Sequence, residues 1–133
     1  MARHRIGVIV DNMRLARWQA DALRTIAPDH DFIVYNCVNS RPARRRVRHA
    51  LYYLLNLFAI RNRLTRALPF PSDLAVAAKV DFGSTYEGNW QHLPASLVTQ
   101  IVADQPQVLV KFGMGLLRVP PAADLSVPIL SYH

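Results

Sequence analysis

Short apolar runs of strand length constrain the fold of this chain most strongly, because they carry no charge and do not alternate with polar residues. Residues 6–10 (IGVIV), 108–110 (VLV) and 127–130 (VPIL) are runs of this kind. Continuous apolar runs are typical of strands that are buried on both faces of a parallel sheet. The last two runs lead into glycine-rich or polar sequence, and open α/β folds bind ligands at the edge where parallel strands end. We therefore expect a ligand site at the carboxyl edge of a sheet.

Between these runs lie segments whose apolar residues recur at the spacing of a helix. The apolar face expected for a helix over residues 13–26 consists of Leu15, Trp18, Ala22 and Ile26. The other expected elements are strands at residues 5–10, 31–38, 74–80, 107–111 and 127–132, a loop at 81–92 and a helix at 94–104. Strands that alternate with helices predict the α/β class. The specific expectation is a Rossmann-like, open, mainly parallel sheet with flanking helices, incomplete at its C-terminus.

The size of the chain and its cysteine content limit what it can be. With 133 residues, the chain is expected to form a single, partial domain over residues 1–133. A lone cysteine, Cys37, excludes an internal disulfide and a zinc site built from cysteines, and its apolar neighbours predict a buried thiol. No metal site is expected. The first apolar run ends at Asp11, too early for a signal peptide, and no run is long enough to span a bilayer, so a cytoplasmic location is predicted.

Residues 41–68 form a distinct basic segment. The sequence between Asp31 and Asp73 contains eight arginines and no acidic residue, whereas the net charge of the whole chain is +7. These arginines are Arg41, Arg44, Arg45, Arg46, Arg48, Arg61, Arg63 and Arg66. An apolar stripe accompanies them, formed by Val47, Leu51, Leu54, Leu55 and Phe58. The pattern predicts an arginine-rich amphipathic helical insertion whose charges face solvent or contact a polyanion or a membrane surface.

Two turns at strand ends bear on the expected site. The first strand is followed by the sequence DNMR, whose lack of glycine disfavours a dinucleotide-binding turn. Asp11 or Asn12 is expected to cap the following helix instead. Gly113 and Gly115 are expected to form a tight turn with positive φ, which also allows the backbone to approach a flat ligand closely.

The C-terminal sequence carries a resemblance to a known family. An apolar strand continues into FGMGLL (residues 112–117), and after a short crossover a second apolar strand ends on Ser131, Tyr132 and His133. This pattern resembles the N-terminal domain of the formyltransferases, which act on methionyl-tRNA, glycinamide ribonucleotide and sugar amines. The resemblance implies a Rossmann-like parallel sheet. It also implies transfer of a formyl group from 10-formyltetrahydrofolate to an amine acceptor, which can carry a phosphate or a nucleotide.

The resemblance also implies individual site residues. His133 matches the family's histidine, and Ser131 stands where the family has an asparagine, so these two are the expected catalytic residues. In the family the pair polarises the formyl group and stabilises the oxyanion, but a serine hydroxyl is shorter than an amide and donates from a different position. The expected donor pocket consists of Phe112, Gly113, Met114, Gly115 and Leu116. The family also uses a downstream loop and an aspartate that residues 1–133 do not contain, so we expect little or no turnover from this chain.

Two other hypotheses remain open from the residues alone. One is a non-catalytic Rossmann-like module that binds a polyanion or a membrane surface through its basic helix, with nucleic acid not the favoured partner. The other is half of a nucleotide-sugar glycosyltransferase, which shares the α/β frame. Salt-sensitive binding to anionic lipid or nucleic acid, without an effect of folate on thermal stability, is the result that favours the basic module.

Overall fold

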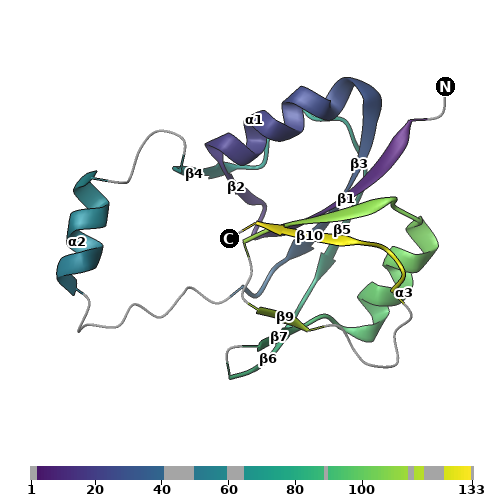
Figure 1. Ribbon diagram of the computed structural model, residues 1–133. Coiled ribbons are helices and arrows are strands. Elements are labelled where there is room, and N and C mark those ends of the chain that lie inside the picture. The colour runs from purple at the N-terminus through teal and green to yellow at the C-terminus, as the bar shows by residue number, and fades with distance from the viewer. Residues whose placement is uncertain are drawn as a thin grey trace.

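The chain has a fold of the α/β class, in which two mixed sheets are flanked by helices (Figure 1). The computed structural model describes residues 3–40, 50–59, 65–88, 90–113, 116–118 and 125–132. The strands are β1 (His4–Asp11), β2 (Arg14–Ala16), β3 (His30–Cys37), β4 (Ala67–Pro69), β5 (Val76–Phe82), β6 (Thr85–Glu87), β7 (Trp90–His92), β8 (Val108–Phe112), β9 (Leu116–Arg118) and β10 (Ile129–Tyr132). The helices are α1 (Arg17–Ile26), α2 (Ala50–Ala59), α3 (Ala95–Asp104) and the short 3₁₀ helix η1 (Ala27–Asp29).

Parallel strands form the centre of the larger sheet, in the order β5-β3-β1-β8-β10. The short strands β2 and β4 extend this sheet from the end of β1 in the antiparallel direction. β6, β7 and β9 form the smaller sheet. The chain first builds outward from β1 to β3 and β5, and then continues on the other side of β1 with β8 and β10. The strand order therefore reverses between β1 and β8, which is the place where open α/β sheets bind ligands.

Burial on both faces of the sheet explains why the apolar run of β1 is continuous. Successive side chains of a strand point to opposite faces. Val8 and Val10 pack with Leu23 on the side of α1, whereas Ile9 packs with Ile101 on the side of α3. All five side chains are almost fully buried. The two faces of β1 thus contribute to two apolar cores, one under each helix.

The strands and helix expected from the longer patterns are confirmed. β1, β3, β5, β8 and β10 lie at the five places where apolar runs predict strands, within a few residues of the expected ends. α3 follows Pro94 and occupies the expected short helix. β1, β3 and β8 are largely buried, as their runs predict, whereas β5 and β10 lie at the edges of the parallel strands and are largely exposed.

Three expectations for shorter segments are wrong. Residues 13–16 are not helical, because Met13 lies in a tight turn and Arg14–Ala16 form β2, which pairs with β4. Residues 81–92 are not a loop, since they complete β5 and form the paired strands β6 and β7. Residues 67–68 belong to β4 and not to a helical insertion. Strands of three residues depend on their partners, and local periodicity does not report such pairing.

The basic insertion is described only in part. Its helix α2 lies apart from the sheet, at the left of Figure 1. Leu51, Leu54 and Leu55 are 70%, 52% and 60% exposed, so these members of the expected apolar stripe are not buried against the core. Among the eight arginines of this segment, Arg66 lies within the described residues and the other seven lie outside them. No helix in the described ranges is both long and apolar enough to cross a membrane.

Replacement of Tyr35 by phenylalanine is expected to lower the free energy of unfolding by about 1 kcal/mol at neutral pH, because a partly buried hydrogen bond to a carboxylate is lost. The Tyr35 hydroxyl donates to Asp104 Oδ2 at 2.8 Å and joins the central sheet to the end of α3. Burial and the Asp104 carboxylate raise the pKa of Tyr35 above the usual 10.0.

The raised pKa gives this prediction a pH dependence. The hydroxyl stays protonated in the folded chain after the unfolded chain has begun to ionise, so its contribution is present below about pH 10 and is lost as the pH rises further. Urea unfolding of the wild type and of Tyr35→Phe at pH 7 and at about pH 10.5 measures both effects. Equal stability of the two chains at pH 7 would contradict the prediction.

Candidate functional site

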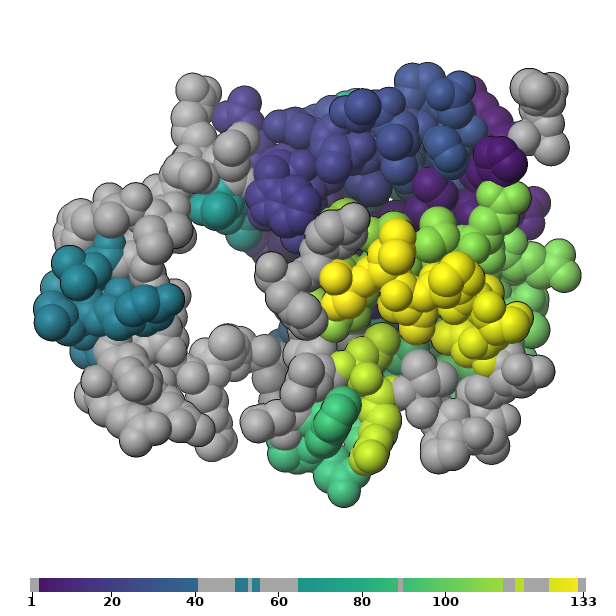
Figure 2. All heavy atoms as spheres, viewed as in Figure 1, coloured from purple at the N-terminus to yellow at the C-terminus, as the bar shows by residue number. Residues whose placement is uncertain are grey.

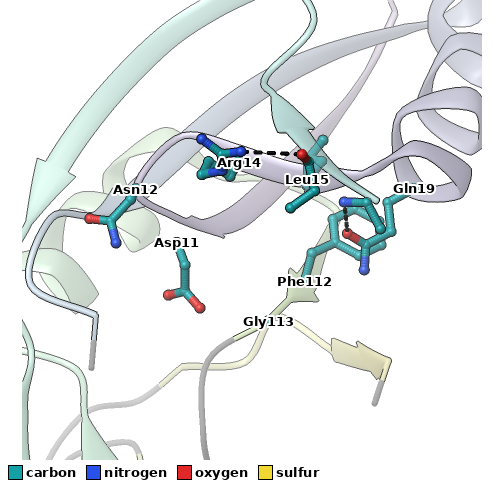
Figure 3. A pocket seen from close by; sticks show the side chains of 9 residues that line it. Asp11, Asn12, Arg14, Leu15, Gln19, Phe112 and Gly113 are labelled. Carbon is teal, nitrogen blue, oxygen red and sulfur yellow. Dashed lines mark hydrogen bonds between the residues drawn. The ribbon is translucent and has the colours of Figure 1, made fainter. Parts of the chain in front are cut away.

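A cavity opens at the carboxyl edge of the larger sheet, at the reversal of strand order between β1 and β8 (Figure 3). Its volume is about 300 Å³, at the lower end of the range for small-molecule sites. The β1–β2 turn, β2, the start of α1, β4 and the end of β8 all contribute to it. The lining residues are Asp11, Asn12, Arg14, Leu15, Ala16, Gln19, Ala67, Phe112 and Gly113.

The β1–β2 turn that borders the cavity has left-handed backbone at two consecutive residues. Asn12 and Met13 have φ values of 49° and 52°, the geometry of a two-residue hairpin whose central residues both have positive φ. Asn12 N donates to Cys37 O at 2.9 Å, and Met13 N donates to Asn36 Oδ1 at 2.8 Å. Left-handed backbone costs a non-glycine residue about 1–2 kcal/mol. The hydrogen bonds from the end of β3 therefore hold a strained turn beside the cavity.

The expectation that Asp11 or Asn12 caps a helix is wrong. β2 intervenes, and α1 begins at Arg17 with Ala16 as its N-cap. The Ala16 N–H is satisfied by the Gln19 side chain, whose Oε1 accepts it at 2.9 Å. Asp11 instead lies at the end of the central strand β1, where it lines the cavity.

Two features of the structure at residue 113, its backbone conformation and a close neighbour, favour glycine over other residue types. Its φ is +72°, as expected for the turn after β8. A Cβ atom at this position would lie 2.7 Å from Asp11 Oδ2, which is too close for non-bonded atoms. Figure 3 shows the Asp11 carboxylate directed toward Gly113. The absence of a side chain at residue 113 therefore lets the Asp11 carboxylate lie against the backbone after β8.

Lys111 adds a buried charge next to this site. It pairs with Ser131 of β10 in the parallel register and is 2% exposed. Burial lowers the pKa of its ammonium, and the nearby Asp11 carboxylate acts in the opposite direction. Buried charges are normally paired, and Lys111 together with Asp11 is neutral overall. Arg14, which lines the cavity, provides a second cation at this edge.

Some of the residues expected to form the site are brought together. Phe112 and Gly113 line the cavity at the end of β8. Ser131 and Tyr132 lie on the adjacent strand, because β10 pairs in parallel with β8 and sets Tyr132 opposite Phe112. Figure 2 shows β10, in yellow, at the surface of the molecule, and Ser131 is exposed. The segment expected to bind the donor and the strand that leads to the expected histidine are therefore neighbours.

The other expected site residues are less well described. Met114, Gly115 and His133 lie outside the described residues. Leu116 is the first residue of β9, where only its backbone is described, and it pairs with Trp90 of β7. Leu116 thus belongs to the smaller sheet, as a strand residue rather than part of a turn.

Sequence reasoning misses most residues of this site, among them the polar residues Asp11, Asn36 and Lys111. It predicts Asp11 as a helix cap, and it gives Asn36 and Lys111 no role beyond that of strand residues. In the sequence, such residues could be recognised as polar or charged residues within an otherwise apolar run. A residue of this kind is rarely buried without a partner. Asn36 and Lys111 both fit that description, and both are buried.

A second polar cluster at the same edge has a structural role. Gln91 is buried, and its Nε2 donates to Ser84 Oγ at 3.0 Å and to Cys37 Sγ at 3.4 Å. Asn39 binds the Ser84 backbone on both sides, through two hydrogen bonds of 2.8 Å. The Cys37 thiol is buried, as expected. These contacts join the ends of β3 and β5 to β7.

Replacement of Asn36 by alanine is expected to lower the free energy of unfolding by about 1–2 kcal/mol, because two partly buried hydrogen bonds lose their partner. Its Oδ1 accepts from Met13 N at 2.8 Å and its Nδ2 donates to Asp81 Oδ1 at 2.9 Å. Asn36→Asp is the informative comparison, since it keeps the acceptor for the turn, although it loses the donor and sets a second carboxylate beside Asp81. Urea unfolding measures stability, and amide shifts of Asn12 and Met13 report the turn. A turn that is unchanged in Asn36→Ala would contradict the prediction.

Comparison of the chain with protein-family models, with curated proteins and with solved structures finds no significant match. Within the described ranges, no group of three or more histidine, cysteine, aspartate or glutamate residues could hold a metal ion.

Proposed function

We propose that this protein binds 10-formyltetrahydrofolate at the carboxyl edge of its larger sheet and takes part in formyl transfer to an amine acceptor. The parallel pairing of β8 with β10 is the observation that carries the proposal. It sets Phe112 and Gly113, expected to bind the donor, beside the strand that leads through Ser131 to His133. Those two segments carry the resemblance to formyltransferases, and a shared site requires them to be adjacent.

The cavity residues suit a flat donor. Leu15, Ala16 and Phe112 supply apolar surface, and the backbone at Gly113 is free of a side chain. Formyl transfer is an acyl transfer, in which hydrogen-bond donors aimed at the developing oxyanion contribute most to the rate. The Ser131 hydroxyl supplies one such donor in this proposal, and the imidazole of His133 supplies the second.

The proposal includes a Rossmann-like architecture and a cytoplasmic location. Support for the architecture comes from the strand order β5-β3-β1-β8-β10, with α1 and α3 packed on opposite faces.

Thermal unfolding in the presence of ligand tests the proposal. A ligand that binds only the folded state adds about 2.7 kcal/mol of stability at a hundred times its Kd. We expect a concentration-dependent rise in Tm with 10-formyltetrahydrofolate and with tetrahydrofolate, but not with p-aminobenzoylglutamate, which lacks the pterin. No rise in Tm with either reduced folate would contradict the proposal.

A second candidate function is attachment to an anionic membrane surface through α2. The observation that favours it is the exposure of Leu51, Leu54 and Leu55, together with Tyr52, on one short helix. Arginines flank this helix in the sequence on both sides. Basic residues attract anionic headgroups, and exposed leucines gain from entering the acyl boundary but gain little from nucleic-acid phosphates.

Vesicle co-sedimentation tests this second function. The chain is expected to bind vesicles containing phosphatidylserine, to bind pure phosphatidylcholine weakly, and to be released by salt. Replacement of Leu51, Leu54 and Leu55 by serine is expected to weaken binding about tenfold or more, since each buried methylene is worth about 0.8 kcal/mol. Val102→Ser on α3, which also alters an exposed apolar residue, is the control. Equal binding of the triple variant would exclude α2 as the contact.

A further inference from the structure

β5 lies at one edge of the larger sheet and offers a long strand for further pairing. Among the described residues it pairs with β3 only. Its residues before Phe82 are exposed or partly buried, although most of them are apolar. An unpaired strand edge pairs readily with another chain unless proline, a bulge or charges protect it. The bulge and the charges of β5 therefore decide which part of this edge can take a partner.

A bulge limits the regular part of the edge to five residues. The register against β3 shifts between Phe32 and Ile33, so that Ala77 has no partner in β3. From residue 78 to residue 82 the pairing is regular. This segment contains neither proline nor glycine, and Val80 is its middle residue.

The peptide groups of Lys79 and Asp81 face the outer side of β5. Val38 N donates to Phe82 O at 3.0 Å, so the peptide groups of Phe82 face β3. Peptide groups alternate in direction along a strand, so those of Val80 also face β3, whereas those of Lys79 and Asp81 face outward. An antiparallel partner exchanges hydrogen bonds at every second residue, and Lys79 and Asp81 have this spacing.

The charges of the segment are symmetric about Val80. Lys79 Nζ lies 3.6 Å from Asp81 Oδ1, and the two side chains are 47% and 55% exposed. Asn36 Nδ2 donates to the same Asp81 oxygen at 2.9 Å and orients the carboxylate. When two copies pair antiparallel about Val80, each Lys79 lies opposite the Asp81 of the other copy. Opposite charges at directly opposing positions stabilise an antiparallel pair.

Other alignments of two copies lack this match. A twofold axis at Lys79 or at Asp81 sets two like charges against each other, and parallel pairing in register does so at both positions. The axis at Val80 is also the one that uses all five regular residues. It places the small side chain of Ala78 opposite the large one of Phe82 on the other face of the sheet.

We propose that β5 is a homodimerisation edge, through which residues 78–82 of two copies pair antiparallel about Val80 and form one continuous sheet. Such an interface is isologous, with the same strand contributed by both copies. The inference does not depend on the proposed function, since no residue of β5 lines the cavity. A pair of short strands is a small interface, so the association is weak and weakens further with salt.

Sedimentation of the wild-type chain at low salt, from about 1 to about 500 µM, tests the inference. The chain is expected to be monomeric at the low end and to form dimers at the high end. Amide hydrogen exchange of Lys79 and Asp81 is expected to slow at least about tenfold on dimerisation, whereas that of Val80, which faces β3, does not change. A monomer throughout this range, or a dimer in which these two amides are not protected, would overturn the inference.

Charge reversal tests the register. Lys79→Glu opposes two carboxylates and Asp81→Lys opposes two ammonium groups, so each variant alone is expected to dimerise at least about tenfold more weakly than the wild type. A mixture of the two variants again pairs opposite charges at both positions and is expected to form a heterodimer. Arg17→Glu makes the same change of charge as Lys79→Glu on the surface of α1, and it is expected to dimerise as the wild type does.

Two results with these variants contradict the proposed register. One is dimerisation of Lys79→Glu at the wild-type affinity, and the other is a mixture that associates no better than its components. Asp81→Lys also loses the contact with Asn36. If that variant does not fold, the exchange pattern of the wild type and the affinity of Lys79→Glu decide the inference.

Discussion

Gly113→Ala is expected to bind 10-formyltetrahydrofolate at least about tenfold more weakly than the wild type and to unfold with about 2–3 kcal/mol less free energy. Two effects add in this variant. Left-handed backbone, with φ of +72°, disfavours alanine, and the new methyl group would lie 2.7 Å from Asp11 Oδ2. The Asp11 carboxylate must then turn away from Gly113 and leave the position that it holds at the cavity. Ligand titration and urea unfolding measure the two losses.

Gly88→Ala is the matched control for this prediction. Gly88 also has positive φ, +59°, but a Cβ there meets no atom within 4 Å. This variant is expected to lose only the conformational part, about 1–2 kcal/mol, and to bind the ligand as the wild type does. If the two glycine variants lose stability and binding equally, the close approach of Asp11 to Gly113 has no role.

Gly7→Ala is expected to have the largest effect on stability, a loss of about 3 kcal/mol at the upper end of the range for overpacked cores. Gly7 lies in the middle of β1, and its Cβ would overlap Leu109 Cδ2 and lie 3.0 Å from Tyr35 Cε2. Both neighbours are fully buried and cannot move aside easily. Urea unfolding measures this loss. If the free energy of unfolding depends on urea concentration with the same slope in both chains, the loss belongs to the folded state.

Gly83→Ala tests whether this loss depends on space rather than on the glycine itself. Gly83 has neither positive φ nor a crowded neighbourhood, since the nearest atom to its Cβ site is Asn39 Nδ2 at 3.6 Å. This change is expected to leave the free energy of unfolding within about 1 kcal/mol of the wild type. A loss as large as that of Gly7→Ala would contradict the packing argument.

The central strands are predictable from the sequence because they are buried on both faces. The runs that form β1 and β8 contain neither a strict alternation of apolar and polar residues nor a proline, and such runs are typical of the interior of a parallel sheet. β2, β4, β6 and β7 are not predictable in the same way. Each is only three residues long and exists through pairing with another strand, so its own sequence carries little information.

Some residues of the candidate site are likewise predictable from the sequence and others are not. Phe112 and Gly113 are predictable, because a glycine directly after a buried strand marks a turn at the sheet edge. The role of Asp11 is not, because it depends on β2 separating the strand end from α1 and on the proximity of Gly113, which is distant in sequence. Lys111 lies within an apolar run and is predicted only as a strand residue. A buried lysine requires a partner nearby, and the sequence does not show which residue that partner is.

The binding site for 10-formyltetrahydrofolate on the wild-type chain is the central claim, and amide shift mapping tests it most directly. Saturable shifts are expected at Asp11, Phe112, Gly113 and Ser131, which lie on three neighbouring strands at one edge of the sheet. The exposed residues of α2 should not respond. Absence of saturable shifts at these strand ends, or shifts confined to α2, would contradict the account.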